Sequence, residues 1–184
     1  MKKFFAIAAL AVASLTANAQ AWLGGSFGFN WEKGKWDGAK ATTSWKIAPE
    51  IGYNINENWA IAGKIAVGGE SRYTEAHRDE AQVEKSVTTF TVSPYARYTF
   101  AQIDDLSFFV DGGIHFTSYG KDNGSSFGIG IQPGLAYKVA DGVTLAAKFG
   151  YFGWKTYDKE AGNKDQFGLG VDGNNLEFGI YFDL

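Results

Sequence analysis

The last nine residues of the chain alternate between large apolar side chains and polar or small ones. They read LEFGIYFDL, and the apolar positions are Leu176, Phe178, Ile180, Phe182 and Leu184. Successive side chains of a β-strand point to opposite faces of the sheet. The alternation therefore predicts a strand with one apolar face and one polar face.

Seven earlier segments alternate in the same way, so the sequence predicts eight strands. They cover residues 21–31, 42–55, 59–72, 83–100, 106–119, 125–139, 143–157 and 166–184. The connections 56–58, 101–105 and 140–142 are short, and the other four are longer and polar. Short turns that alternate with longer loops are typical of outer-membrane β-barrels. We therefore predict an all-β fold, an eight-stranded antiparallel up-and-down transmembrane barrel.

The first 19 residues have the features of a secretory signal peptide. Lys2 and Lys3 precede an apolar run over residues 4–15, and Ala17-Asn18-Ala19 forms a small-x-small cleavage site. The apolar run is shorter than the roughly 20 residues that a membrane-spanning helix needs. We expect residues 1–19 to be cleaved, which leaves residues 20–184 as a single barrel domain.

The last predicted strand changes parity along its length. Phe167, Leu169 and Val171 are apolar at odd positions, whereas residues 176–184 are apolar at even positions. A bulge at residues 172–175 would reconcile the two halves. A turn there would instead make the first half a separate strand of a larger barrel. The sequence around Phe167–Asn175 is compatible with a barrel of either eight or ten strands.

Composition excludes several classes of protein. The formal net charge is −3, and loss of the two signal-peptide lysines would make it −5, so there is no basic footprint for nucleic acid. The chain has no cysteine, which excludes disulfides and thiol chemistry. Residues 20–184 contain no apolar run of 18 residues, so a membrane-embedded chain must be a closed barrel.

Charged residues within the predicted strands fall on the face opposite the apolar side chains, which places them in the barrel lumen. Glu50, Lys64, Tyr95, Asp111 and Lys148 each lie five residues from the short-turn end of their strands, so we expect them at one depth. Glu50 should face Lys64 across a short turn and pair with it. The apolar outward set includes Tyr151. The predicted lumen network is Glu50, Lys64, Tyr95, Arg97, Asp111, Lys148 and Glu177.

His115 is the one histidine on a predicted strand, and it points inward. A lipid A-modifying enzyme could use such a histidine as a base beside a nucleophile. The sequence shows no recognisable acyl-transfer motif near His115, so we predict no catalytic, cofactor-binding or metal-binding residue and no enzyme activity. A hydrogen-bonded lumen histidine fits the pattern better.

A repeated motif gives the chain a family resemblance. Pro49, Pro94 and Pro133 occur in APEIGY, SPYARY and QPGLAY, and each is followed four residues later by a tyrosine. Together with the signal peptide and the ending NLEFGIYFDL, these motifs resemble the small outer-membrane β-barrel domain proteins of the porin-like superfamily. Their architecture is that of the OmpA transmembrane domain and OmpX. The family often ends on an aromatic residue, where this chain has Leu184.

The resemblance implies the cell outer membrane of a Gram-negative envelope as the location. We expect outer-membrane lipids, including lipopolysaccharide, and the barrel-insertion machinery as partners, no cofactor, and a monomer. The expected role is non-enzymatic: a barrel with a side-chain-filled lumen that serves a structural or surface-interaction role through its extracellular loops. The alternatives are a narrow pore for ions or small solutes and a lipid A-modifying enzyme that uses His115.

Overall fold

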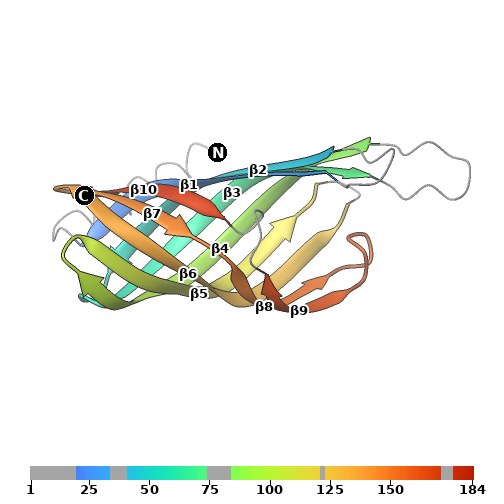
Figure 1. The fold of residues 1–184 in the computed structure, drawn as a ribbon. Coiled ribbons are helices and arrows are strands. Elements are labelled where there is room, and N and C mark those ends of the chain that lie inside the picture. Colours follow the sequence, from blue (N-terminus) through green and yellow to red (C-terminus); the bar gives the residue numbers. More distant parts are fainter. Residues whose placement is uncertain (1–19, 34–40, 74–83, 121–122, 171–175) are drawn as a thin grey trace, which may run out of the picture.

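The computed structural model describes residues 20–33, 41–73, 84–120, 123–170 and 176–184. No helix in these residues is long and apolar enough to cross a membrane. The described residues form ten antiparallel strand segments in one sheet (Figure 1). The segments are β1 (Ala21–Lys33), β2 (Ala41–Asn54), β3 (Trp59–Tyr73), β4 (Glu84–Ile103), β5 (Leu106–Ser118), β6 (Ser125–Ala140), β7 (Val143–Lys148), β8 (Tyr151–Tyr157), β9 (Asp165–Gly170) and β10 (Glu177–Asp183).

The ten segments make eight barrel strands, because the last four run end to end in pairs. β6 pairs with β7 along one half of its length and with β8 along the other half. On the far side of these two, β10 pairs with β7 and β9 pairs with β8. Pairing of β1 with β10 closes the ring. The prediction of an eight-stranded antiparallel barrel is therefore confirmed, while the proposed bulge at residues 172–175 lies outside the described residues.

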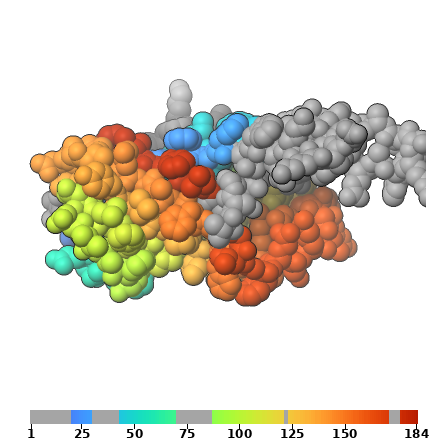
Figure 2. Space-filling view, viewed as in Figure 1, coloured from blue at the N-terminus to red at the C-terminus, as the bar shows by residue number. Residues whose placement is uncertain are grey.

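The seam between the first and last strands is paired over residues 22–27 of β1. In the space-filling view the red residues of β10 lie between β1 in blue and β7 in orange (Figure 2). Further toward the long-loop end, β9 pairs with β8 alone within the described part of the chain. This single pairing leaves Phe167 and Leu169 with 74% and 71% of their surfaces exposed.

The break between β7 and β8 corrects one predicted orientation. Tyr151 was expected to face outward with Phe149, but its ring lies 5.5 Å from that of His115 and its hydroxyl is buried. Gly150, with a φ of 70°, separates the two segments. Glycine adopts this left-handed conformation without steric cost, and an extra residue at the break reverses the alternation. Phe152 faces outward instead and is exposed.

The two faces of the sheet have opposite character. Charged side chains such as Glu50, Lys64 and Glu177 are buried inside, while most large apolar side chains of the strands are exposed outside. This inversion suits a wall that contacts lipid. In the last strand, Leu176, Phe178, Ile180 and Phe182 are exposed and Leu184 is half-buried.

Candidate functional site: a polar cluster in the lumen

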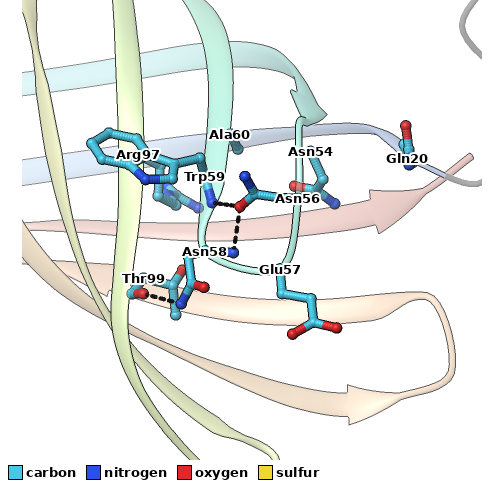
Figure 3. Close-up of a pocket in the computed structure, with 9 residues that line it drawn as sticks. All are labelled: Gln20, Asn54, Asn56, Glu57, Asn58, Trp59, Ala60, Arg97 and Thr99. Carbon is cyan, nitrogen blue, oxygen red and sulfur yellow. Dashed lines mark hydrogen bonds between the residues drawn. The ribbon is translucent and has the colours of Figure 1, made fainter.

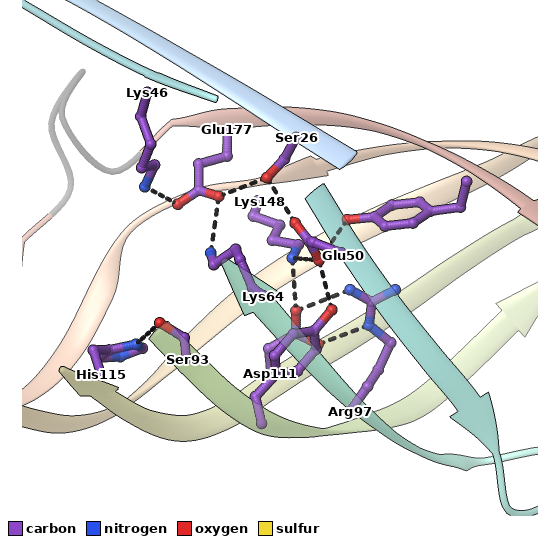
Figure 4. Close-up of polar contacts among 12 residues, drawn as sticks. Ser26, Lys46, Glu50, Lys64, Ser93, Arg97, Asp111, His115, Lys148 and Glu177 are labelled. Atoms are coloured by element: carbon purple, nitrogen blue, oxygen red, sulfur yellow. Dashed lines mark hydrogen bonds and ion pairs between the residues drawn. The ribbon is translucent and has the colours of Figure 1, made fainter. Parts of the chain in front are cut away.

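Polar side chains from seven strands meet inside the barrel at the depth of Glu50 (Figure 4). Each occupies an inward position of its strand, so regular alternation along the strands is sufficient to direct them all to one place. We call this group the lumen cluster, and its members are Ser26, Lys46, Glu50, Lys64, Tyr95, Arg97, Asp111, Lys148, Glu177 and Tyr181.

Glu50 accepts hydrogen bonds from four sides and is only 1% exposed. The donors are Ser26 Oγ at 2.6 Å, Tyr95 OH at 2.6 Å, Lys148 Nζ at 3.0 Å and Tyr181 OH at 3.2 Å. A buried carboxylate is stable only when it is paired and hydrogen-bonded. This coordination supplies both the opposite charge and the donors.

Asp111 forms the second anionic centre of the cluster. Arg97 contacts it with two parallel bonds, from Nε to Oδ1 at 2.7 Å and from Nη2 to Oδ2 at 2.9 Å. Lys148 Nζ lies 3.2 Å from Oδ2 of the same carboxylate. The guanidinium carbon of Arg97 is 3.9 Å from the centre of the Phe109 ring, a favourable cation–π position. Lys148 therefore links the Glu50 and Asp111 centres.

Glu177 is the third anionic centre. Lys46 and Lys64 both donate to its carboxylate, the latter at 3.1 Å. Ser26 Oγ lies 3.1 Å from Glu177 Oε2 as well as beside Glu50, so its single proton is shared between two carboxylates. Through this hydroxyl the three centres form one connected network.

The structure brings all seven residues of the predicted lumen network into this cluster. The predicted direct pairing of Glu50 with Lys64 is wrong, although the two residues are opposite each other in the β2–β3 register. Glu50 pairs instead with Lys148 of β7, and Lys64 pairs with Glu177 of β10. Sequence reasoning did not single out Lys46, although it shares the inward parity of Glu50 on the same strand.

His115 lies on β5 beside the cluster, with Nδ1 3.2 Å from Ser93 Oγ. Ser93 is 1% exposed. A histidine base needs a third group that orients it, and no described side chain is hydrogen-bonded to His115 Nε2. Among the described residues, the contact therefore has no third member of a hydrolytic triad. Two residues further along β5, the Thr117 hydroxyl lies 2.9 Å from the Thr91 hydroxyl and is hydrogen-bonded to it.

A shallow pocket of about 380 Å³ opens at the short-turn end of the barrel (Figure 3). Its amides mainly stabilise the turn: Asn56 Oδ1 accepts bonds from the backbone nitrogens of Asn58 and Trp59, and Asn58 Nδ2 donates to the Thr99 carbonyl. Arg97, at the inner end, is engaged by Asp111. No group of three or more potential metal ligands occurs in the described residues.

A family model described as "Outer membrane protein beta-barrel domain" matches residues 4–179. The chain belongs to this family. As a member it is an outer-membrane protein, and its exposed apolar strand positions are the lipid-facing surface.

Two solved structures share the fold. The crystal structure of Neisserial surface protein A is 13% identical with a TM-score of 0.55, and the alignment covers 91% of this chain and 98% of that chain. The outer membrane protein OprG from Pseudomonas aeruginosa is 10% identical with a TM-score of 0.55, covering 90% and 96%. No curated protein matches the chain. Because these identities are low, the similarity extends to the architecture alone.

Proposed function

We propose that this family member is a non-enzymatic barrel whose lumen is closed by side chains, and that it acts structurally or through surface interactions at its long-loop end. The observation that carries the proposal is the lumen cluster. Its ion pairs bridge separate parts of the wall: Glu50 of β2 with Lys148 of β7, and Lys64 of β3 with Glu177 of β10. An eight-stranded barrel is just wide enough for side chains to fill.

Aromatic side chains close the lumen beside the charges. Trp22, Tyr95, Phe109 and Tyr181 are each at most 8% exposed and pack as one group, with Trp22 edge-on to Tyr181 at 4.9 Å. Large rings and paired charged side chains at one level leave little room for water. This packing supports a closed lumen over a narrow pore.

The long-loop end offers at least one ordered surface. Asp158 accepts bonds from the backbone nitrogen of Ser125 at 2.6 Å, its hydroxyl at 2.8 Å and the Ala161 nitrogen at 2.9 Å. These bonds fasten the connection between β8 and β9 to the start of β6. Binding residues concentrate on loops that a rigid scaffold holds, so this connection is a candidate contact surface.

We also propose the partners that the exposed wall supports. The apolar outer face suits outer-membrane lipids, including lipopolysaccharide, and the alternating last strand suits recognition by the barrel-insertion machinery. The pairing of β1 with β10 closes the ring within one chain, which is consistent with a monomer.

Conductance of the purified, refolded protein in a planar bilayer tests the closed lumen. We expect no stable channels. Stable channels whose conductance changes in Lys64→Met or Asp111→Asn would favour the pore instead. The lipid A-modifying alternative predicts loss of acyl chains that depends on His115, which mass spectrometry of lipid A from expressing cells would detect.

A loop replacement tests the surface role. Residues 158–165 are replaced by a two-residue turn, and folding is checked by the shift in gel migration on heating in SDS. We expect a folded barrel with reduced adherence or aggregation of the expressing cells. Cells that lack the whole protein are compared in parallel. If the loop variant behaves as wild type and the deletion changes only the sensitivity of the cells to detergent, the role is structural.

A further inference from the structure

A second polar site lies in the lumen on the wall formed by β5, β6 and β8. His115 is opposite Gly128 on β6, and Gly128 is opposite Lys155 on β8. A Cβ atom added at Gly128 would meet the Tyr151 hydroxyl at 3.4 Å and Lys155 Cγ at 3.5 Å. The Tyr151 hydroxyl and the aliphatic stem of Lys155 thus lie beside Gly128, and His115 is its register neighbour on β5. We call His115, Gly128, Tyr151 and Lys155 the outer-lumen site.

Two buried atoms of this site have no hydrogen-bond partner among the described residues: His115 Nε2 and the Tyr151 hydroxyl. His115 Nδ1 lies 3.2 Å from Ser93 Oγ. When that hydroxyl donates to Nδ1, the ring proton resides on Nε2, which is then a donor. Buried polar groups are almost always paired in folded proteins. In that tautomer both atoms can donate, so an acceptor can satisfy both of them.

The charges around the site favour an anion. Four charged side chains act electrostatically on the His115 ring. Three are cations and one is an anion: Lys64, Lys155, Lys46 and Glu177. Lys46 and Lys64 share the one carboxylate of Glu177. Lys155 has no carboxylate partner among the described side chains; its ammonium is hydrogen-bonded to Tyr157 and Tyr119, and Nζ lies 4.8 Å from the centre of the Tyr157 ring. The other two cations of the lumen cluster, Lys148 and Arg97, are matched by Glu50 and Asp111.

We propose that the outer-lumen site binds an oxyanion of the phosphate class. His115 Nε2 and the Tyr151 hydroxyl donate to its oxygens, and the Lys155 ammonium supplies opposite charge. A phosphate group has several strong acceptor oxygens, and bonds to charged acceptors are stronger than those to neutral ones. A water molecule could pair with the two orphan atoms, but it has no charge to balance that of Lys155, which lacks a carboxylate partner within the described part of the chain. The phosphate can come from inorganic phosphate or from a lipid headgroup.

The test uses residues 20–184 refolded in dodecyl maltoside, a detergent without phosphate. The chain has two histidines, so a His77→Gln background with ¹⁵N-labelled histidine reports on His115 alone. Inorganic phosphate and dihexanoyl phosphatidic acid are titrated separately. We expect a saturable shift of the His115 Nε2 resonance with at least one of them. Isothermal titration calorimetry measures the affinity.

Matched variants assign the binding to the site. Tyr151→Phe removes one hydroxyl, and Lys155→Met removes the charge while keeping the side-chain stem. Each should weaken binding at least tenfold. Lys138→Met is the control, because Lys138 is exposed near the short-turn end and pairs with Asp141; it should bind as the parent does. Heat-shifted gel migration confirms that every variant is folded.

The outcomes separate the sources of the phosphate. Saturable binding of inorganic phosphate identifies a free-anion site, and binding of phosphatidic acid alone identifies a headgroup site. Absence of saturable binding to either probe would overturn the proposal and leave a hydrated lumen. Binding that is unchanged in folded Tyr151→Phe and Lys155→Met would overturn it equally.

Discussion

Glu50 and Lys64 face each other across β2 and β3, yet neither is the other's ion-pair partner. Lys148 Nζ on β7 lies 3.0 Å from the Glu50 carboxylate, and Lys64 Nζ lies 3.1 Å from Glu177 on β10. Neighbours on a wall are already joined by backbone hydrogen bonds. Pairs that cross the lumen add links between strands that are distant around the ring, so they stabilise the closed barrel rather than one hairpin.

The crossing pair Glu50–Lys148 should show strong energetic coupling. Both side chains are at most 2% exposed. Removing one partner of a buried pair strands a charge and costs about 3–5 kcal/mol, whereas removing both costs less. We expect Glu50→Gln and Lys148→Met each to lower the free energy of unfolding in urea by that order, and the double variant by less than the sum.

The matched control is the cycle for Glu50→Gln with Lys64→Met, measured under the same conditions. These residues are neighbours without an ion pair, so their coupling should be clearly smaller. Equal coupling in both cycles would mean that the pairing across the lumen is not the native arrangement.

Alternation along the strands was sufficient to predict which residues of the cluster point inward. Glu177, for example, is fixed on the lumen side by the apolar residues on either side of it. The partner of each charge could not be predicted in the same way. The partner depends on the tilt and stagger of the strands around the closed ring, which bring side chains of β2 and β7 into contact across the lumen. A local sequence pattern carries no information on tilt or stagger.

The orientation of Tyr151 shows a second limit. Regular alternation from Phe149 predicted an outward ring, but Gly150 adopts a φ of 70° and shifts the strand by one position. The sequence does contain a weak signal for the reversed orientation, since the neighbouring Phe152 is an apolar residue that can occupy the outer face in place of Tyr151. By contrast, the parity change near residues 172–175 was visible because alternating apolar positions stand on both sides of it.

The lipid-facing side of β10 should tolerate charge according to depth. Phe178 is paired with Phe27 and Ala147, whereas Phe182 is paired with Leu23 and Val143, next to a short turn. An arginine costs about 2–4 kcal/mol near the midplane and about 0–1 kcal/mol near the interfaces. Phe178→Arg should therefore reduce the outer-membrane level of the protein, measured by membrane fractionation, more than Phe182→Arg does. Phe178→Leu is the control for size, and it should be close to wild type.

Gly130 should be intolerant of a side chain because Tyr151 packs against it. A Cβ at Gly130 would lie 2.5 Å from Tyr151 Cζ and 2.6 Å from the Phe152 carbonyl oxygen. Overpacking of this kind costs typically about 1–3 kcal/mol. Gly130→Ala should lower the free energy of unfolding by that amount, followed by tryptophan fluorescence in urea. Gly63→Ala, where no atom lies within 4 Å of the new Cβ, should be nearly neutral; similar losses in both variants would contradict the inward packing of Tyr151.

The loop fastened by Asp158 should loosen in acid. Burial raises the pKa of the Asp158 carboxyl, but hydrogen bonds from Ser125 and from the Ala161 backbone outweigh it and hold the pKa below its ordinary value of 3.8. A carboxyl whose pKa is lowered by folding stabilises the folded loop fully above the ordinary pKa, and this contribution is lost as the pH falls through the lowered value.

The Ser125 and Ala161 amide resonances of the refolded protein report on these bonds directly. Both should titrate with a midpoint below pH 3.8, the ordinary pKa of this carboxyl. In Asp158→Asn they should lie at the acid position at every pH, because the amide group carries no charge. Glu160→Gln serves as the control and should titrate as wild type does at both amides. A midpoint above pH 3.8 at Ser125, or an unchanged titration in Asp158→Asn, would show that another group controls the ordering of this loop.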